Sequence, residues 1–397
     1  MPPPPPPPPG EVVLTGLGLV GFRNLEDREL EIPPEGVALV GRNAQGKSNF
    51  LEAVYYLEVF RSPRGTRDAH LISFHRDHFR LVGGLAPGGE VSAVTAAVQR
   101  GGSPTKKVTV DGREPERLGD AVGHLGAVLF TPGDVRLVSD GPGERRRFLD
   151  ILLSVNHPGY LEALQRYRQV ISHRNAALRS SAGPAAIQAW DALLSRPGGL
   201  VSAARAGWVR DVGEAFAEVY RTVADGEAAT MEYRPATPGA DDITIEGAAD
   251  PDAWEARLRQ ALADSLEGDR ERGATRPGPH RDDLRLRVLP EGSEEDEGET
   301  RDLREYGSGG QQRTAALALR MVEASTRARR LGRPPLLLLD DVFAELDEGR
   351  SRRILRLLDE TATGQVLLTA PREADIRLRP GELARWTIEA GRIREAS

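Results

Sequence analysis

Apolar and polar positions follow different patterns along the chain, and each pattern predicts a different kind of structure. Near the beginning, short apolar runs predict strands, and residues 48–60 carry apolar side chains at helical spacing. From residue 79 to about 110, side chains alternate with the two-residue period of strands, in segments separated by glycine turns such as Gly83-Gly84. This pattern predicts an antiparallel meander. The predicted strands outside this meander cover residues 13–19, 30–32, 36–40 and 128–134.

The middle of the chain has a helical pattern instead. Leu161, Leu164 and Tyr167 begin one apolar helical face, and Trp254 and Leu258 begin another with steps of four. We therefore expect a largely helical insertion in this region. Its predicted helices cover residues 160–180, 185–194, 200–223 and 253–266.

Composition limits the class of protein. A length of 397 residues favours two domains, or one domain with a large insertion. The chain has no cysteine and no apolar run long enough to span a bilayer, so we expect a cytoplasmic protein without membrane contact. The formal net charge of −7 argues against a uniformly basic nucleic-acid binder, but it leaves room for a local basic patch.

Two segments have biased composition. Pro2 to Pro9 form a polyproline run, which predicts an extended, solvated tail rather than part of a packed core. Residues 291–299 are rich in glutamate and predict a solvated acidic loop.

The strongest chemical signal is a phosphate-binding P-loop between the strand at 36–40 and the helix at 48–60. Its glycines allow a tight turn that aims backbone N–H groups at a triphosphate, its lysine contacts the β- and γ-phosphates, and its serine offers a hydroxyl to Mg²⁺. A glycine-rich surface turn is the alternative, but both flanking elements are predicted. The loop consists of Gly41, Arg42, Asn43, Ala44, Gln45, Gly46, Lys47 and Ser48.

A second signal is the apolar run at residues 336–339, which ends in Asp340 and Asp341. A buried parallel strand that ends in a carboxylate places the acid where open α/β sheets bind ligands. We therefore predict that Asp340 holds Mg²⁺ as a Walker B acid and that Asp341 orients or deprotonates the attacking water. The next apolar strand, at 366–368, ends in Thr369 at the position of a switch residue.

A third glycine-rich segment opens a helix just upstream of that strand. By itself this segment indicates a helix cap. Because it lies between the P-loop and the strand that ends in Asp340, it resembles the signature motif of ABC ATPases. In those proteins the signature motif completes the nucleotide site of a partner subunit. Asp347 matches the D-loop of the same superfamily. The signature residues are Ser308, Gly309, Gly310 and Gln311.

Longer strings of residues point to one family. The chain resembles the RecF family of bacterial recombination mediators, whose heads are ATPases of the ABC and SMC type. Gly278 to Asp283 (Gly-Pro-His-Arg-Asp-Asp) and the Arg-Arg-Phe-Leu-Asp of residues 146–150 are specific to this family. Arg42 departs from the family pattern, and Ser48 replaces the commoner threonine while keeping the hydroxyl. The other matching strings are residues 21–24, 43–47, 51–57, 173–175 and 308–314.

The resemblance implies an α/β fold: an ABC-type P-loop ATPase head of two lobes with mixed and parallel sheets, and an inserted, mainly helical second domain. The expected division is a disordered tail at 1–11, the first part of the head at 12–150, the helical insertion at 151–275 and the rest of the head at 276–397. We expect His280 to Asp283 to form a polar junction between the insertion and the head, since one histidine beside two acids is too little for zinc.

The resemblance also implies function. Such proteins bind ATP with Mg²⁺, hydrolyse it slowly, and form an ATP-dependent homodimer. They bind double-stranded DNA near single-strand gaps, and they work with the mediators RecO and RecR to load recombinase. Arginines that contact phosphates are the expected means of binding DNA. The arginine clusters to consider are Arg61, Arg64 and Arg67; Arg145, Arg146 and Arg147; and Arg327, Arg329, Arg330 and Arg333. A solvated or salt-bridged face is the alternative for each cluster, and a structural role between lobe and insertion is a further alternative for residues 145–147.

Two other classes stay open at this point. An ABC-type ATPase that serves a machine other than DNA, such as a transporter, would use the same motifs. A structural DNA-bridging protein would need no ATP chemistry, although Lys47, Asp340 and Asp341 are intact.

Overall fold

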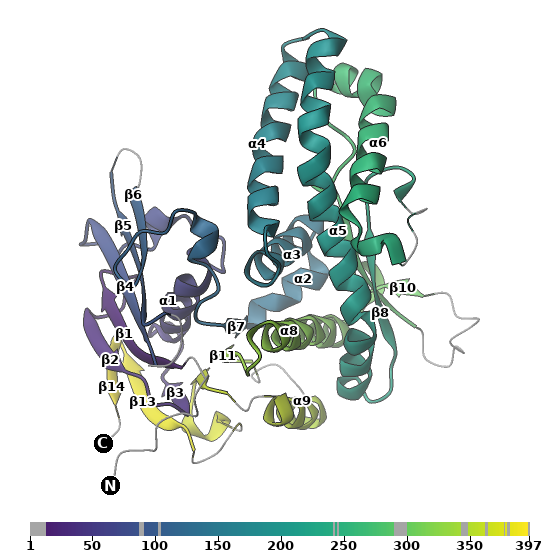
Figure 1. The fold of residues 1–397 in the computed structure, drawn as a ribbon. Coiled ribbons are helices and arrows are strands. Elements are labelled where there is room, and N and C mark those ends of the chain that lie inside the picture. The colour runs from purple at the N-terminus through teal and green to yellow at the C-terminus, as the bar shows by residue number, and fades with distance from the viewer. Residues whose placement is uncertain are drawn as a thin grey trace. The chain divides into compact units, whose positions relative to one another are not determined.

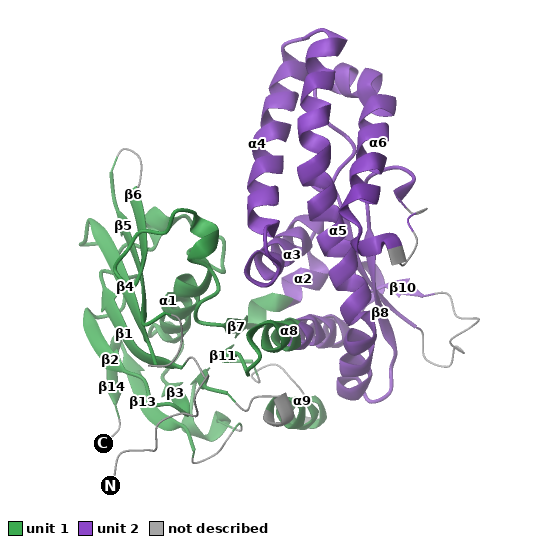
Figure 2. Ribbon diagram, viewed as in Figure 1, with its two compact units in different colours: residues 1–134, 323–397 green, residues 135–322 purple. Residues whose placement is uncertain are grey.

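A computed structural model describes the chain at residues 13–86, 91–101, 105–240, 243, 246–289, 300–342, 348–361, 364–376, 378 and 382–395. The described residues form two compact units, shown in different colours in Figure 2. Unit 1 consists of residues 1–134 and 323–397, and unit 2 of residues 135–322. The polyproline run, the acidic loop and Asp347 lie outside the described residues, and so do the expectations attached to them.

Unit 1 contains two sheets (Figure 1). A five-stranded antiparallel sheet has the order β2-β1-β4-β5-β6, and a six-stranded sheet has the order β14-β13-β3-β12-β11-β7. In the second sheet every neighbouring pair is parallel except β13 with β14. The strands are β1 (Leu14–Val20), β2 (Arg28–Glu31), β3 (Gly36–Val40), β4 (His78–Leu85), β5 (Ala93–Gln99), β6 (Thr105–Val110), β7 (Ala127–Phe130), β11 (Leu336–Asp340), β12 (Val366–Ala370), β13 (Ala384–Glu389) and β14 (Arg392–Glu395).

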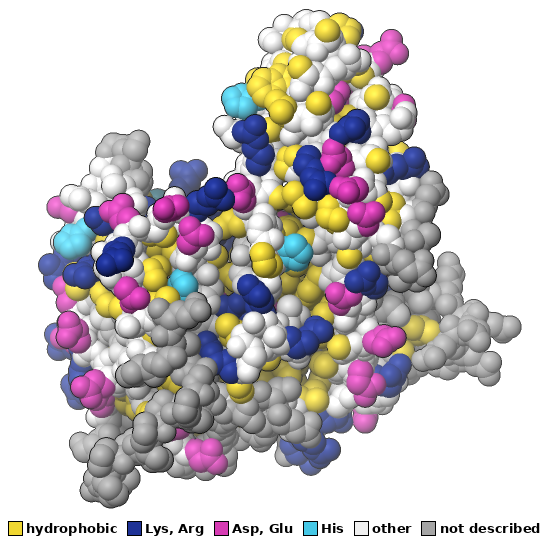
Figure 3. Space-filling view, viewed as in Figure 1, with side chains coloured by type: hydrophobic (Ala, Val, Ile, Leu, Met, Phe, Trp, Pro, Cys, Tyr) yellow, Lys and Arg dark blue, Asp and Glu magenta, His cyan; other side chains and the backbone are white. Residues whose placement is uncertain are grey.

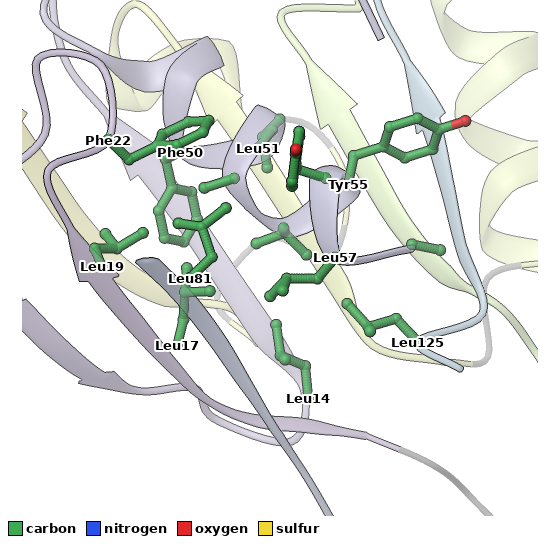
Figure 4. Packing of buried hydrophobic residues seen from close by; sticks show 14 of the residues in the cluster. Leu14, Leu17, Leu19, Phe22, Phe50, Leu51, Tyr55, Leu57, Leu81 and Leu125 are labelled. Carbon is green, nitrogen blue, oxygen red and sulfur yellow. The ribbon is translucent and has the colours of Figure 1, made fainter. Parts of the chain in front are cut away.

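The helix α1 (Lys47–Val59) packs against strands of both sheets in unit 1. Its Phe50, Leu51 and Leu57 lie in one apolar cluster with Leu17 and Leu81 from the antiparallel sheet (Figure 4). Nearly the whole circumference of α1 is buried, so its apolar residues are not confined to one stripe. This burial holds the beginning of α1 in place behind the P-loop. The other helices of unit 1 are α9 (Glu348–Thr361) and the 3₁₀ turns at Asp68–His70, Leu118–Asp120 and Glu373–Asp375.

Unit 2 is mainly helical, with one small antiparallel sheet in the order β10-β9-β8. The helices α4, α5 and α6 pack along one another. Helix α8 begins in unit 2 and ends in unit 1. The elements are α2 (Arg136–Ser139), α3 (Pro142–Asn156), α4 (Tyr160–Arg179), α5 (Pro184–Val223), β8 (Ala229–Arg234), α6 (Pro251–Arg272), β9 (Asp283–Val288), β10 (Arg301–Asp302), α7 (Leu303–Tyr306) and α8 (Gly309–Leu331), with a 3₁₀ turn at Glu246–Ala249. A further 3₁₀ turn, Pro132–Val135, begins in unit 1 and ends at the first residue of unit 2.

The fold class predicted from the sequence is confirmed, and three local predictions are corrected. Gly83 and Gly84 do not form a turn but lie inside β4, where they pair with Val94 and Ala93. At Gly83 a Cβ atom would lie 3.1 Å from the Leu57 side chain, so the glycine allows α1 to approach the sheet.

The second correction concerns the helices predicted at 185–194 and 200–223, which are one continuous helix, α5. It includes Pro197, a residue that normally breaks a helix because it lacks an N–H donor. The two glycines that follow it permit close packing rather than a chain break. A Cβ atom at Gly199 would lie 2.6 Å from the backbone nitrogen of Glu255, which is in α6.

The third correction concerns the boundaries of the second domain. The compact unit spans 135–322, whereas the sequence suggested an insertion at 151–275. The wider span has a physical reason, since β9 pairs with β8 and α3 packs against β9. The predicted polar junction is likewise internal to unit 2. His280 accepts a hydrogen bond from the Tyr167 hydroxyl, and Asp282 accepts hydrogen bonds from the Tyr233 hydroxyl and the Ala236 N–H. All of these residues belong to unit 2.

No helix within the described part of the chain is long and apolar enough to cross a membrane.

Candidate functional site

The P-loop of the sequence lies between β3 and α1, at the carboxyl end of the parallel strands. Ala44 has a φ of 65° and Gly46 a φ of 116°, so the loop turns through left-handed conformations before the helix begins. Gly41 is needed for a different reason. A Cβ atom there would lie 2.5 Å from the Ile388 carbonyl oxygen of β13. Helix α1 begins at Lys47, directly after this turn, and the first N–H groups of a helix are the ones that bind anions.

Lys47 lies inside the turn of this loop. Its ammonium donates to the carbonyl oxygen of Gly41 at 2.6 Å, to that of Arg42 at 3.3 Å and to the side-chain oxygen of Asn43 at 3.3 Å. The residue is only 6% exposed. All three partners are neutral oxygens, so a phosphate would offer this cation a stronger, charge-assisted hydrogen bond.

Three residues from separate motifs meet at one carboxylate oxygen. Ser48 donates its hydroxyl to Oδ1 of Asp340 at 2.9 Å, and Thr369 donates to the same oxygen at 2.8 Å. The register of the sheet explains the meeting, because β11 and β12 pair in parallel with Asp340 opposite Thr369. Carboxylate and hydroxyl oxygens are the hard ligands that Mg²⁺ prefers. Ser48 and Asp340 are therefore suited to hold the ion.

These residues line a pocket of about 320 Å³, called the P-loop pocket here. Asp341, with a φ of 49°, also lines it. So does Arg64, which donates to the Asn49 side chain at 3.1 Å and is 44% exposed. From the sequence Arg64 is only a candidate for DNA contact, since a basic loop does not indicate which edge of the sheet it reaches. The pocket is lined by Asn43, Ala44, Gly46, Lys47, Ser48, Asn49, Arg64, Pro132, Asp340 and Asp341.

A brace behind the P-loop was also not predicted. The Asn24 side-chain oxygen accepts from Asn49 at 2.7 Å, and the Gln45 side-chain oxygen accepts from the Ala390 N–H at 2.6 Å. Gln45 also accepts through its carbonyl from the Gly391 N–H at 2.9 Å. The turn at residues 21–24 and the hairpin after β13 thus support the loop from behind. The available signal was the family string at 21–24.

The predicted signature residues cap α8. The Ser308 hydroxyl accepts from the Gln311 N–H at 3.2 Å, and the Ser308 N–H donates to the Gln311 side chain at 2.7 Å. This reciprocal pair is a capping box, which stabilises the start of the helix. Ser308 and Gly309 are exposed. A Cβ atom at Gly309 would meet nothing within 4 Å, so the helix start is open to a ligand from outside unit 2.

The arginine clusters proposed for DNA have mixed locations. Arg327 is buried and pairs with Glu58 at 3.0 Å, while Arg145 is buried and pairs with Asp283 at 2.7 Å. These two arginines are structural. Arg61, Arg67 and the pair Arg329 and Arg330 are exposed. On the face shown in Figure 3, Lys and Arg side chains are interspersed with Asp and Glu rather than gathered into one basic surface.

Comparison with known proteins was made with this geometry in hand. Residues 13–380 match the family described as the RecF/RecN/SMC N terminal domain. The DNA replication and repair protein RecF of Anaeromyxobacter sp. (strain K) is 38% identical over 352 residues, which cover 87% of this chain and 89% of that protein. The protein of the same name from Frankia alni is 35% identical, with coverage of 97% of this chain and 100% of the relative.

Solved structures agree. A structure titled as the recombination mediator protein RecF-ATP in the RecFOR pathway matches with a TM-score of 0.84 and 26% identity, over 98% of each chain. The Smc head domain of Pyrococcus furiosus matches with a TM-score of 0.53 and 14% identity, a likeness of fold alone. Both the extent of the sequence matches and the fold lead to one conclusion: the chain belongs to the RecF family.

Proposed function

We propose that this chain is an ATP-dependent DNA-binding protein of replication and recombinational repair that binds ATP with Mg²⁺ in the P-loop pocket and hydrolyses it slowly. The observation that carries the proposal is the meeting of Ser48, Asp340 and Thr369 at one oxygen, beside the buried ammonium of Lys47. The names of the family relatives support the role in replication and repair.

In this proposal each residue has a separate task. The Lys47 ammonium gives up its hydrogen bonds to the carbonyl oxygens of the loop and donates to the β- and γ-phosphates instead. The N–H groups at the start of α1 contact the same phosphates. Ser48 and Asp340 hold Mg²⁺, which when bound neutralises charge on the phosphate oxygens. Asp341 orients the water that attacks the γ-phosphorus, and ADP leaves in line with it. Thr369 keeps Asp340 oriented.

The second half of the nucleotide site is proposed to come from another copy of the chain. The exposed start of α8, at Ser308 and Gly309, is the candidate, because N–H groups at a helix N-terminus bind anions. A two-fold dimer then contains two equivalent composite sites, and ATP stabilises it by mass action.

Mixed variants test this arrangement. We expect Ser308→Arg to bind ATP as a monomer but to lose ATP-dependent dimerisation and hydrolysis, whereas Ser180→Arg, the same change at another exposed serine, behaves like the parent. Mixing Ser308→Arg with Lys47→Ala restores one composite site and part of the turnover. Sedimentation with ATP and turnover of the mixture measure both. A Ser308→Arg protein that dimerises normally would refute the shared site.

DNA is the proposed macromolecular partner, as duplex with single-strand gaps, and RecO and RecR are the proposed protein partners in a cytoplasmic setting. Contacts to backbone phosphates predict an affinity that falls steeply with salt and depends little on sequence. Titration of gapped and blunt duplexes, with and without ATP, measures this. A salt-independent affinity would point to groove reading instead.

A further inference from the structure

Unit 2 contains a second pocket, of about 270 Å³, that no part of the ATP mechanism uses. Arginines reach it from three helices: Arg146 and Arg147 from α3, Arg168 from α4 and Arg205 from α5. Asp150 is the carboxylate that lines it. We call it the arginine pocket; its remaining lining includes Tyr167 and His280.

The carboxylate in this pocket is already occupied by donors. Asp150 accepts from the Tyr160 hydroxyl, from Arg205 and from Arg168, each at 2.7 Å. Arg205 is engaged as well, since it also donates from Nε to the Tyr160 hydroxyl at 3.1 Å and from Nη1 to the Pro279 carbonyl at 2.7 Å. This group of bonds holds the wall of the pocket rigid, and Asp150 has little capacity left to neutralise further arginines.

Arg146 is a half-buried arginine of this pocket whose hydrogen bond goes to a neutral oxygen. It donates from Nη1 to the Asp282 carbonyl at 2.8 Å, which leaves most of its N–H donors without a partner among the described residues. Burial and the nearby Arg205 guanidinium lower the pKa of Arg146 below its usual value, although the carboxylates of Asp283, Asp282 and Asp150 act in the opposite direction. The lining of the pocket itself holds four arginines and one carboxylate, so an added anion would stabilise the half-buried guanidinium of Arg146.

The rest of the wall is neutral. His280 accepts at Nδ1 from the Tyr167 hydroxyl at 2.7 Å, because its Nε2, 3.2 Å from the Thr275 carbonyl oxygen, must carry the hydrogen. Burial lowers the pKa of His280 to about 4, so the ring is uncharged near neutral pH. The arginines therefore set the charge of the pocket.

We propose that the arginine pocket binds a phosphate dianion, either free or at the end of a phosphomonoester. Planar guanidinium groups match the oxygens of phosphate with paired hydrogen bonds. The volume of about 270 Å³ lies below the range of roughly 300–1,000 Å³ typical of drug-sized ligands, so the ligand is small. A phosphodiester within a duplex carries a sugar on both sides, whereas a phosphomonoester enters a pocket end-on.

The test uses the full chain with Lys47→Ala, so that the P-loop does not bind the probe. Inorganic phosphate is titrated by calorimetry. We expect binding to persist in this background and to weaken about tenfold or more with Arg168→Gln, because one charge-assisted contact is lost. Arg166→Gln is the matched control: it makes the same charge change two residues away on α4, and Arg166 does not line the pocket.

Arg168 is 55% exposed, so its replacement is compatible with folding; Arg146→Gln supplies a second, independent variant. A further arm compares 5′-phosphorylated with 5′-hydroxyl oligonucleotides. If the pocket takes strand ends, the phosphorylated strand binds more tightly and the difference disappears with Arg168→Gln. If it takes free phosphate, the two strands bind equally while phosphate itself still binds. Equal phosphate affinity in Arg168→Gln, Arg166→Gln and their parent would overturn the proposal, and so would no binding at all.

Discussion

The P-loop pocket of unit 1 is built largely from one continuous turn of backbone, whereas the arginine pocket of unit 2 is built from side chains that reach it from three helices. The first needs glycines and a strand–turn–helix, and these are consecutive in the sequence. The second needs residues as far apart as Arg146 and His280. A site made of backbone is therefore readable as a motif, while a site made of dispersed side chains depends on the packing that brings them together.

The largest effect is expected where unit 2 relies on long-range charge pairing. Arg174 is 0% exposed and pairs with Asp191 at 2.6 Å and Asp269 at 2.8 Å, so it joins α4, α5 and α6. Arg174→Ala leaves the buried Asp191 carboxylate without its cation and leaves Asp269 with Arg276 alone, so it should lower the free energy of unfolding by about 3–5 kcal/mol. Arg259→Ala, which removes an exposed pair, should cost no more than about 1 kcal/mol. Denaturant unfolding measures the free energy of unfolding of both variants. Equal losses in the two variants would contradict the claim that unit 2 depends on its buried charge pairs.

Unit 1 should respond in ligand binding rather than in folding. Lys47→Ala removes the ammonium from the P-loop and should weaken ATP binding about 100-fold or more, since we propose that this ammonium contacts both the β- and γ-phosphates. Lys107→Ala, at an exposed lysine of β6 paired with Glu114, is the control and should bind ATP normally. Calorimetry with ATP and Mg²⁺ measures both. Unchanged affinity in Lys47→Ala would remove the phosphate-binding role from this loop.

An intermediate effect tests the close packing of α5 against α6 in unit 2. Gly199→Ala places a methyl group 2.6 Å from the Glu255 nitrogen and 2.8 Å from the Pro251 oxygen, so α5 and α6 must separate. We expect a loss of about 1–3 kcal/mol. Gly213→Ala, in the same helix with nothing within 4 Å, should instead stabilise by about 0.5–1 kcal/mol. Thermal unfolding compares them, and the same sign for both would contradict close packing as the role of Gly199.

The smallest expected effect is a pH dependence. Burial lowers the pKa of His280 to about 4 from an unfolded value near 6.5, so the unfolded chain binds the proton more readily. This contribution to stability is complete above about pH 6.5 and is lost as the pH falls toward 4. His280→Gln should therefore flatten the decline between those values, and His157→Gln, at an exposed histidine, should not. Unfolding curves at several pH values provide the test. A parallel decline in all three proteins would place the titration elsewhere.

Much of unit 1 could be predicted because its signals are local. The buried run before Asp340, the strand before Gly41 and the helix after Lys47 each follow from consecutive residues, and the structure places Ser48, Asp340 and Thr369 together at one sheet edge. The carboxyl ends of parallel strands share an edge, so their terminal residues meet without any further information.

What the sequence by itself determined was thus the α/β head, the P-loop and the acids at the strand ends, since fixed spacing and glycine encode backbone conformation directly. Only the tertiary structure decided that α5 continues through Pro197, that Arg64 reaches the P-loop pocket, and that Arg145 and Arg327 are buried partners of acids. It also decided the extent of unit 2 and its arginine pocket. The physical reason is that an arginine's role depends on which distant group it meets, and no spacing in the chain records that meeting.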